Sequence, residues 1–391
     1  MQKKLIALAV AGLASTAAFG QVTVYGVMDG TFDSVSASSP VVPGDKLSRT
    51  NRVSANSSYV GVKGAEDLGG GNSALFQVEM GVGFDSAAGI SASRDSFVGL
   101  KSDALGSVML GNLTGPTRAL GAAVDVFSGA TGIGTNGGII GKLGNIALNG
   151  ADTAAANPLL AADCGRSATC VSTFDTRWKN ALAYVSPTFA GVTATAVYVA
   201  NENRTQDGAA TQLNSSGTDI GIRYAAGPLM AAVTVNSLKM KNEAAVGNFD
   251  VNAKASNLRI GAKYDFGVVA VSGMVDQTKA SDAAGEVKQR VYGAGVQVPV
   301  GAGKVVGQYY AAGDLKIDGQ ADDNTGAKLI ALGYEHSLSK RTMVKAVYAR
   351  LNNEDEAMYD FGVNAVGIGG FDGGGDGASV RGFSVGVRHS F

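Results

Sequence analysis

The sequence is poor in the residues that carry most enzyme and metal chemistry. Its 391 residues include two Cys and two His, too few for most metal or thiol sites. Only 17% are charged, and 32 Lys and Arg against 33 Asp and Glu leave no excess of charge that would attract nucleic acid. With 56 Gly and 7 Pro, the composition fits neither collagen, a coiled coil nor a disordered charged tail. We therefore expect no metal, no cofactor and no nucleic-acid partner.

Long hydrophobic runs are also lacking, apart from a short one at the amino terminus. Met1–Lys4 is basic, Leu5–Ala14 is apolar, and small residues follow as far as Gly20. This order predicts a cleavable signal peptide at 1–20 and a single domain at 21–391. The order disfavours the alternative, an apolar first helix of the folded domain. No other run approaches the ~18 residues of a transmembrane helix, so an exported chain stays soluble or crosses a membrane as strands.

A small unit recurs along the chain, namely Gly, then an apolar residue, then usually a charged or amide residue. Four of its intervals are 34 to 40 residues long, which fits two strands of about ten residues, one tight turn and one longer loop. The copies are Gly61-Val62-Lys63, Gly99-Leu100-Lys101, Gly221-Ile222-Arg223, Gly261-Ala262-Lys263, Gly295-Val296-Gln297, Gly333-Tyr334-Glu335 and Gly386-Val387-Arg388.

Apolar side chains alternate with period two between these units. Across 258–266 every second residue is apolar, and Arg259, Gly261 and Lys263 share the other face. A soluble sandwich would alternate in the same way. The aromatic residues favour a membrane barrel, because several lie on the apolar face near short turns, as in an interfacial girdle, whereas cross-strand packing in a soluble core is the alternative. These aromatics are Tyr184, Tyr224, Tyr264, Phe266 and Tyr334.

The pattern predicts an all-β fold, a 16-stranded antiparallel transmembrane β-barrel. Short and long connections alternate, which is typical of short periplasmic turns and long extracellular loops. The tight turns should follow the even strands, and both chain ends should lie on the periplasmic side. The predicted strands are near 21–33, 48–63, 73–85, 92–101, 106–113, 177–186, 190–201, 217–226, 229–240, 253–266, 267–279, 288–299, 303–313, 326–337, 341–350 and 379–391.

Several segments resemble the Gram-negative general porins, particularly those of the beta-proteobacteria. They are Gln21–Gly26, Gly61–Gly71, Phe97–Leu100, Tyr184–Gly191 and the terminal Phe391. The resemblance implies a homotrimer in the outer membrane of a Gram-negative bacterium, an open channel for ions and small hydrophilic solutes, and a third extracellular loop folded inward. It also implies that Phe391 is the signal for outer-membrane assembly, although this residue could simply belong to the girdle.

The long insertion at about 113–176 follows the fifth predicted strand, where the family has its constriction loop. Family members carry arginines on the wall that face acidic groups of this loop. Arg94 matches one such position, whereas Tyr59 and Asn112 stand where the family commonly has Arg. Any of the basic candidates could instead be a solvated charge at a loop base. The candidates for the pore constriction are Arg94, Arg52, Arg49, Arg118 and Asp125.

The remaining motifs point to structure more than to chemistry. Cys164 and Cys170 are close in the same insertion, so an exported chain is expected to join them in a disulfide, with free thiols as the alternative. The acidic stretch 353–356 and the Gly-rich 371–377 do not match a calcium loop and indicate a hydrated loop. We expect no enzyme activity, because neither His has a partner pattern.

The leading hypothesis is thus a wide, weakly selective diffusion channel. Its alternatives are a substrate-specific channel, which would usually add an aromatic track along the lumen, and an adhesin or receptor barrel with a closed lumen. The inward face is rich in Gly, Ser, Ala and charged residues, which leaves space for water.

Overall fold

One sheet of 20 antiparallel strands makes up almost all of the described secondary structure. The computed structural model describes residues 22–39, 41–86, 89–91, 93–127, 132–142, 174–200, 211–244, 251–281, 285–370 and 375–391. The expected signal peptide and the two cysteines lie outside these residues. No helix in the described ranges is long and apolar enough to cross a membrane.

The elements follow one another with few helical interruptions. The strands are β1 (Thr23–Ser38), β2 (Lys46–Ala55), β3 (Tyr59–Gly69), β4 (Asn72–Gly83), β5 (Gly89–Ser91), β6 (Ser96–Ser102), β7 (Gly106–Thr114), β8 (Arg177–Val185), β9 (Val192–Val199), β10 (Thr211–Ala226), β11 (Leu229–Ala244), β12 (Val251–Asp265), β13 (Ala270–Ser281), β14 (Glu286–Val300), β15 (Gly303–Ala312), β16 (Leu315–Ile317), β17 (Gln320–Asp322), β18 (Ala327–Ser337), β19 (Thr342–Asn353) and β20 (Ser379–Ser390). The helices are α2 (Pro116–Val124), η1 (Asn136–Gly138) and η2 (Ile368–Gly370).

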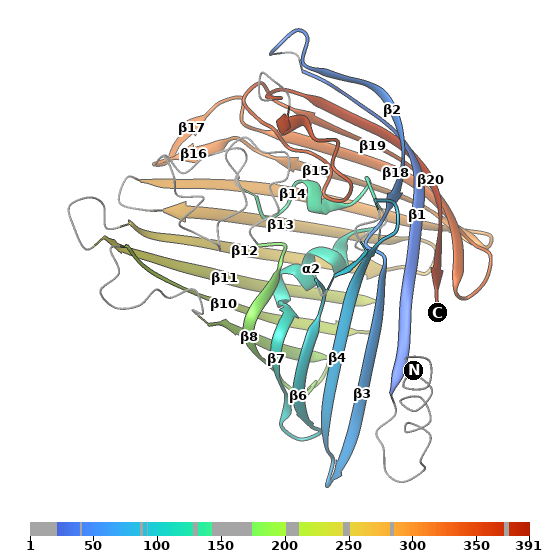
Figure 1. The fold of residues 1–391 in the computed structure, drawn as a ribbon, viewed down its shortest axis with the longest axis vertical. Coiled ribbons are helices and arrows are strands. Elements are labelled where there is room, and N and C mark those ends of the chain that lie inside the picture. Colours follow the sequence, from blue (N-terminus) through green and yellow to red (C-terminus); the bar gives the residue numbers. More distant parts are fainter. Residues whose placement is uncertain are drawn as a thin grey trace, which may run out of the picture.

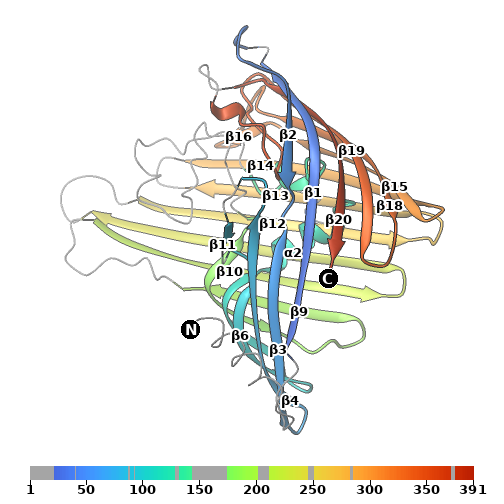
Figure 2. The ribbon, with the colours of Figure 1, turned by 45° about the vertical axis from the view of Figure 1, so that its right-hand side comes forward.

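The sheet closes on itself where its first and last strands meet. β1 pairs with β20 from Val27↔Ser390 to Ser38↔Ser379. Beyond this ladder, Gly26 and Phe391 exchange both backbone hydrogen bonds, at 3.0 and 3.1 Å. The two strands run side by side in both ribbon views (Figures 1 and 2). A closed barrel leaves no unpaired sheet edge, which is the condition for strands to cross lipid.

The wall has sixteen strands, as the sequence predicts. β2 and β3 both pair with β1 and form one wall strand in two pieces. The short strands β5, β16 and β17 have three residues each and extend the long-loop end, so 20 minus these three, with β2 and β3 counted once, gives 16. Short turns follow the even wall strands, for example at Gly267 and Gly301, whose positive φ angles of +83° and +59° favour glycine.

The predicted unbroken strand 48–63 is wrong in one respect, because the structure interrupts it between β2 and β3. The backbone turns at Ser57, where φ is 52°. The Asn56 amide donates to the Asp29 carboxylate at 3.1 Å and to the Thr31 hydroxyl at 3.0 Å. Contacts with the neighbouring strand thus set the break, and the local pattern of β2 and β3 does not show it.

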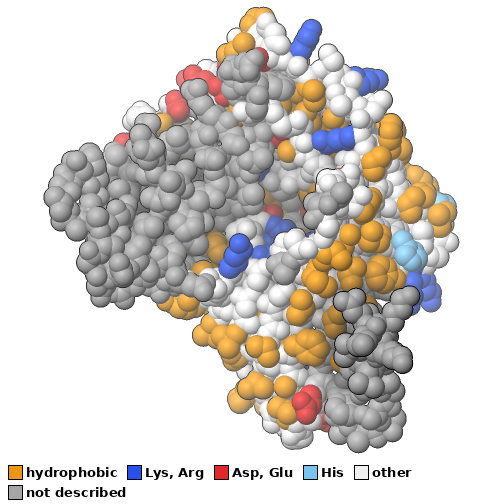
Figure 3. All heavy atoms as spheres, in the orientation of Figure 1, with side chains coloured by type: hydrophobic (Ala, Val, Ile, Leu, Met, Phe, Trp, Pro, Cys, Tyr) orange, Lys and Arg blue, Asp and Glu red, His pale blue; other side chains and the backbone are white. Residues whose placement is uncertain are grey.

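The alternating pattern places apolar side chains outside and polar ones inside. On β12, Leu258 and Ile260 are exposed on the outer wall, while Arg259 between them is fully buried. The five girdle aromatics predicted near the short turns are all exposed on this outer wall. Figure 3 shows apolar side chains spread over the outer surface on the right of the view, with basic side chains in the hollow at the centre.

Helix α2 lies inside the barrel (Figure 1). It begins with Pro116 at its first position, where a missing N–H costs nothing, and it packs on β10 to β13. Glycines on the inner face make room for it. A Cβ on Gly221 would lie 2.6 Å from Pro116, and one on Gly261 would lie 3.1 Å from Leu120. The described parts of the long insertion therefore occupy the lumen.

Candidate functional site

Wall side chains hold helix α2 at both of its ends. The Asp219 carboxylate of β10 accepts hydrogen bonds from the Thr117 hydroxyl at 2.6 Å and from the Thr117 backbone N–H at 3.3 Å. A carboxylate at the amino end of a helix also interacts favourably with the helix dipole. At the other end, the Ser272 hydroxyl of β13 donates to the Val124 carbonyl at 2.7 Å. These contacts fix the helix across the lumen.

The chain beyond α2 is held along the next two wall strands. The Gln297 amide of β14 donates to the Val126 carbonyl at 3.1 Å. On β15, the Gln308 amide donates to the Gly134 carbonyl at 2.7 Å. The Asn136 amide donates to the Tyr310 hydroxyl at 3.1 Å. The insertion therefore follows the inner wall from β10 to β15 and narrows the lumen along this arc.

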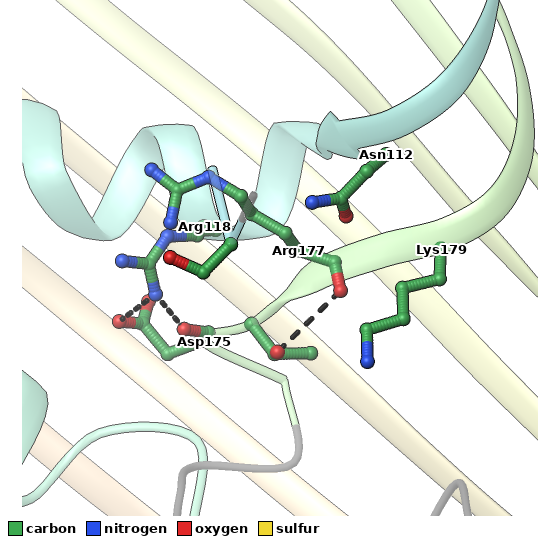
Figure 4. Close-up of a pocket in the computed structure, with 7 residues that line it drawn as sticks. Asn112, Arg118, Asp175, Arg177 and Lys179 are labelled. Carbon is green, nitrogen blue, oxygen red and sulfur yellow. Dashed lines mark hydrogen bonds and ion pairs between the residues drawn. The ribbon is translucent and has the colours of Figure 1, made fainter. Parts of the chain in front are cut away.

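A chain of ion pairs links the insertion to the wall beneath α2. Asp175, at the end of the insertion, pairs with Arg118 of α2 at 3.3 Å and with Arg259 of β12 at 3.1 Å. Arg259 also pairs with Asp276 of β13 at 2.6 Å. Arg259 and Asp276 are buried, so they are structural, whereas the Arg118 side chain is 32% exposed to the lumen. Figure 4 shows Arg118 reaching Asp175.

Arg118 belongs to a group of four basic residues, Arg94, Arg118, Arg177 and Lys179, which we call the basic arc. Arg118, Arg177 and Lys179 line one pocket of about 240 Å³ beside Asn112 (Figure 4). Arg94 and Arg118 both repel Arg177 electrostatically. Lys179 is exposed and forms no ion pair with any described residue.

Two members of the basic arc have carboxylate partners on the adjacent wall. Arg177 pairs with Asp95 at 3.3 Å, and Arg94 pairs with Glu79 at 3.3 Å. The Arg94 guanidinium also lies over the Tyr59 ring, 4.3 Å from its centroid. Tyr59, which stands where the family commonly has an arginine, thus supports the guanidinium of Arg94.

The basic member is the more exposed one in two of the three ion pairs of the basic arc. The side chains of Arg118 and Asp175 are 32% and 14% exposed, and those of Arg94 and Glu79 are 20% and 11% exposed. Arg177 and Asp95 reverse the order, at 17% and 22%. Since Lys179 adds an exposed charge, water beside the basic arc meets more positive than negative groups among the residues that the structure describes.

The predicted candidates do not all lie together. Arg94 and Arg118 are in the basic arc. Arg52 lies elsewhere, pairs with Asp33 at 3.4 Å and donates to the backbone of the β19–β20 connection. Arg49 is exposed on β2, and no hydrogen bond or ion pair joins it to the described residues.

Three basic residues near α2 are absent from the predicted set. Arg177 borders the insertion, and that position was its only signal in the sequence. Lys179 lies at a β-bulge, where two residues of β8 lie opposite the single residue Asn112 of β7. A bulge changes the direction in which side chains point, and the alternation of the sequence does not show this change. Arg259 was identifiable only by its inward position between apolar residues.

Asp125 is buried at the carboxyl end of α2 and organises the insertion. Its carboxylate accepts the backbone N–H of Phe127 at 2.9 Å and that of Asn136 at 3.0 Å. Burial raises the pKa of Asp125 to about 6, although both hydrogen bonds act in the opposite direction. The carboxylate therefore holds two loop segments together rather than lining the water path.

The raised pKa of Asp125 predicts a pH dependence of stability. The folded protein binds this proton more tightly than the unfolded chain, so the stabilisation is fully present below the ordinary value of 3.8 and is lost as the pH rises through about 6. We measure the wild type against Asp125→Asn by urea unfolding in detergent. The difference in their free energies of unfolding should favour the wild type by on the order of 2 kcal/mol more at about pH 4 than at about pH 7.5. An identical pH dependence in both proteins would contradict this role.

Comparison with known proteins identifies the family. The family model of the Gram-negative porins matches residues 7–356. The chain belongs to the Gram-negative porins. Outer membrane porin protein 32 of Delftia acidovorans is 34% identical over 399 residues, which span 100% of both chains. An outer membrane porin protein of Bordetella pertussis is 26% identical over 351 residues, covering 80% of this chain and 81% of its own.

A solved structure agrees with the fold of this porin. The anion-selective porin from Comamonas acidovorans superposes with a TM-score of 0.70 at 27% identity, covering 95% of this chain and 100% of that chain. The porin is thus a multi-pass β-barrel of the Gram-negative outer membrane. It forms a water-filled channel through which ions and small hydrophilic solutes diffuse passively.

Proposed function

We propose that this channel is weakly selective and prefers anions. The observation that carries the proposal is the unequal exposure of charge at the constriction, where the exposed Lys179 has no acidic partner in the described residues. Arg118 and Arg94 are also more exposed than the carboxylates they pair with. An ion sheds part of its hydration shell in a narrow pore and interacts most strongly with the groups that water reaches. The sign agrees with that of the Comamonas porin.

The preference should be weak because most of the basic arc is paired. Arg94, Arg118 and Arg177 each have a carboxylate within 3.3 Å. Pairs of opposite charge cancel at distances longer than their separation, so Lys179 supplies most of the field that remains from the described members of the basic arc. Of the predicted constriction residues, we propose that Arg94 and Arg118 face the water path, whereas Asp125 acts through the shape of the loop.

The reversal potential of the purified porin in a planar bilayer tests this proposal. In a gradient of dilute KCl, we expect an anion-to-cation permeability ratio of about 2 to 7, which corresponds to a local potential of about 0.4 to 1 kT. The ratio should approach one near 1 M salt, where the screening length is about 3 Å. A cation preference, or an anion preference that salt does not weaken, would contradict the proposal.

We also propose that the porin is a homotrimer, exported by a signal peptide at 1–20, with Phe391 as its assembly signal. The support for these points is the resemblance to the porin family and the order of charge and hydrophobicity at the amino terminus. Unheated gel mobility tests the trimer, since a protein that migrates only as a monomer speaks against it. Amino-terminal sequencing of the outer-membrane form tests cleavage after Gly20.

We propose further that the chain is a channel with no enzyme activity of its own. The support is the bonding of its two imidazoles. Nδ1 of His336 contacts the Tyr334 hydroxyl at 3.1 Å, and Nδ1 of His389 contacts the Thr342 hydroxyl at 2.8 Å. Neither arrangement pairs an imidazole with a serine nucleophile. Esterase and phospholipase assays on the purified porin should therefore give no turnover.

A further inference from the structure

Basic residues lie directly opposite each other on three pairs of neighbouring wall strands. Side chains in such positions have Cβ atoms about 5 Å apart, and like charges there destabilise a sheet. A group of opposite charge is needed to offset this repulsion. We call these residues the basic pairs, and they are Lys239↔Lys254 of β11 and β12, Lys279↔Lys288 of β13 and β14, and Arg350↔Arg381 of β19 and β20.

The basic pairs are on the outer surface of the barrel. On β20, Arg381 is exposed and has the same strand parity as Phe383, which is exposed on the outer wall. On β12, Lys254 is exposed and has the parity of the outward Leu258. Successive side chains of a strand point to opposite faces, so residues of one parity share one face. The basic pairs therefore face away from the water path.

The basic pairs also lie at one level along the barrel, toward the long connections. Arg381 is ten residues from Phe391, and Lys254 is ten residues from Tyr264 near the short turns. At about 3.3 Å per residue and a strand tilt of about 40°, ten residues rise about 25 Å, which is the height of the apolar band of an outer-membrane barrel. The basic pairs are thus at the outer border of this band.

Aromatic residues border the arginine pair on the membrane side. Tyr348 of β19 and Phe383 of β20 lie opposite each other, one pair closer to the middle of the wall, and both are exposed on its outer surface. Aromatic rings gather at the boundary between the hydrocarbon and the head groups of a membrane. The guanidinium groups of Arg350 and Arg381, one step further out, are therefore at the level of the lipid head groups.

The chain itself supplies little negative charge to the basic pairs. Lys279 pairs with Glu286, and no other member of the basic pairs forms an ion pair with a residue that the structure describes. The Arg350 Nε donates to the Asn352 side-chain oxygen at 2.8 Å, which orients the guanidinium without neutralising it. The repulsion within the pairs thus calls for an anion from outside the chain.

We infer that the basic pairs bind the phosphate groups of an anionic lipid in the outer leaflet. Two guanidinium groups side by side provide several N–H donors in the geometry that phosphate oxygens accept. The pairs extend along the wall from β11 to β20 at one level, as lipid head groups do, whereas a second copy of the chain would cover one side only. This inference concerns the outer surface and does not depend on the ion preference of the channel.

Thermal unfolding in detergent tests the inference on the purified porin, freed of bound lipid, with lipid A as the probe because it carries two phosphate groups. Arg381→Glu replaces the like pair with an ion pair to Arg350. Without lipid, this variant should unfold at a higher temperature than the wild type. With lipid A, the wild type should show the larger rise in unfolding temperature, because a ligand of the folded state stabilises it.

The matched control is the double variant Lys340→Gln, Arg341→Gln. It makes the same change of two charge units as Arg381→Glu, in the exposed turn between β18 and β19 at the opposite end of the wall. Its unfolding temperature should respond to lipid A as that of the wild type does. Heat-modifiable gel mobility establishes that each variant has folded.

Native mass spectrometry measures lipid binding directly. The double variant Arg350→Gln, Arg381→Gln should weaken the apparent affinity for lipid A about 10- to 30-fold, as expected for two basic residues near an anionic lipid surface. The double variant Lys239→Gln, Lys254→Gln should lose a bound lipid independently, since this pair is on another part of the wall. Dephosphorylated lipid A should bind weakly, and equally to all variants.

Three outcomes would overturn the inference. One is an equal loss of lipid A binding in the arginine variant and in the control. Another is a wild type that inorganic phosphate stabilises as much as lipid A does at the same concentration, which would make the basic pairs sites for free anions. The third is an Arg381→Glu variant that binds lipid A like the wild type but no longer associates with other copies, which would place a second copy at this surface.

Discussion

Replacing Lys179 by glutamate is expected to turn the weak anion preference of this porin into a cation preference. A unit charge about 7 Å from a passing ion contributes about 0.6 kcal/mol in water, or about one kT. Lys179→Glu changes the charge of the side chain by two units. Because the position is exposed and has no ion pair among the described residues, the free energy of unfolding should change little. After screening, we expect the anion-to-cation permeability ratio to fall about tenfold in dilute KCl.

Two further variants separate the local charge from the net charge of the protein. Lys179→Gln removes one charge and should give about half of the change in reversal potential, in proportion to charge. Lys340→Glu makes the same change of two charges in the exposed turn between β18 and β19, outside the basic arc. It should leave the reversal potential near the wild-type value. Equal shifts of the reversal potential in Lys179→Glu and Lys340→Glu would contradict the assignment of selectivity to the basic arc.

Asp29→Ala is expected to be the most destabilising single substitution considered for this barrel. The Asp29 carboxylate of β1 pairs with the Lys345 ammonium of β19 at 2.5 Å and with the Arg388 guanidinium of β20 at 3.3 Å. Asp29 and Lys345 are almost completely buried. Removal of one partner from a buried pair takes away the main compensation of the other charge and costs about 3 to 5 kcal/mol. The effect falls where the barrel closes, because β1, β20 and β19 are consecutive in the wall.

Heat-induced unfolding in detergent, followed by gel mobility, measures this loss. Asp29→Ala should unfold at a clearly lower temperature than the wild type. The double variant Asp29→Ala, Lys345→Met removes both charges and should recover much of the loss, because a hydrophobic residue of similar size often replaces a buried ion pair without cost. If Asp29→Ala unfolds at the wild-type temperature, or if the double variant is the less stable of the two, the closure does not depend on this pair.

The sequence was sufficient to predict the barrel because the signal for it is local and repeated. Alternation such as that across 258–266 fixes which face of a strand meets lipid, and each strand carries this information independently. The break at Asn56 was missed because its cause is Asp29, on another strand. The stretch 353–356 indicated a hydrated loop, whereas the residues that follow it, 357–361, are buried, and Tyr359 among them bonds to Gln289, far away in the sequence.

The role of the predicted constriction residues stays a prediction, and the sequence carried no signal for the contacts that are made across the lumen. Arg94 was selected because it matches a position of the family and Arg118 because it borders the insertion, and both lie in the basic arc. Lys179 depends on a bulge opposite Asn112, and Arg259 depends on where α2 crosses the lumen. Neither feature has a counterpart in the spacing of the sequence.

The pairing of β1 with β20 constrains how the protein is made. Residues 27–38 find their partners at 379–390, so one side of the first strand stays bare until nearly the whole chain has been synthesised. Contacts of such long range form slowly, and until they form the unpaired edge of the strand can pair with other copies of the chain. The chain is therefore most prone to aggregate while it passes through an aqueous compartment, and a chaperone that covers the unpaired edge would protect it there.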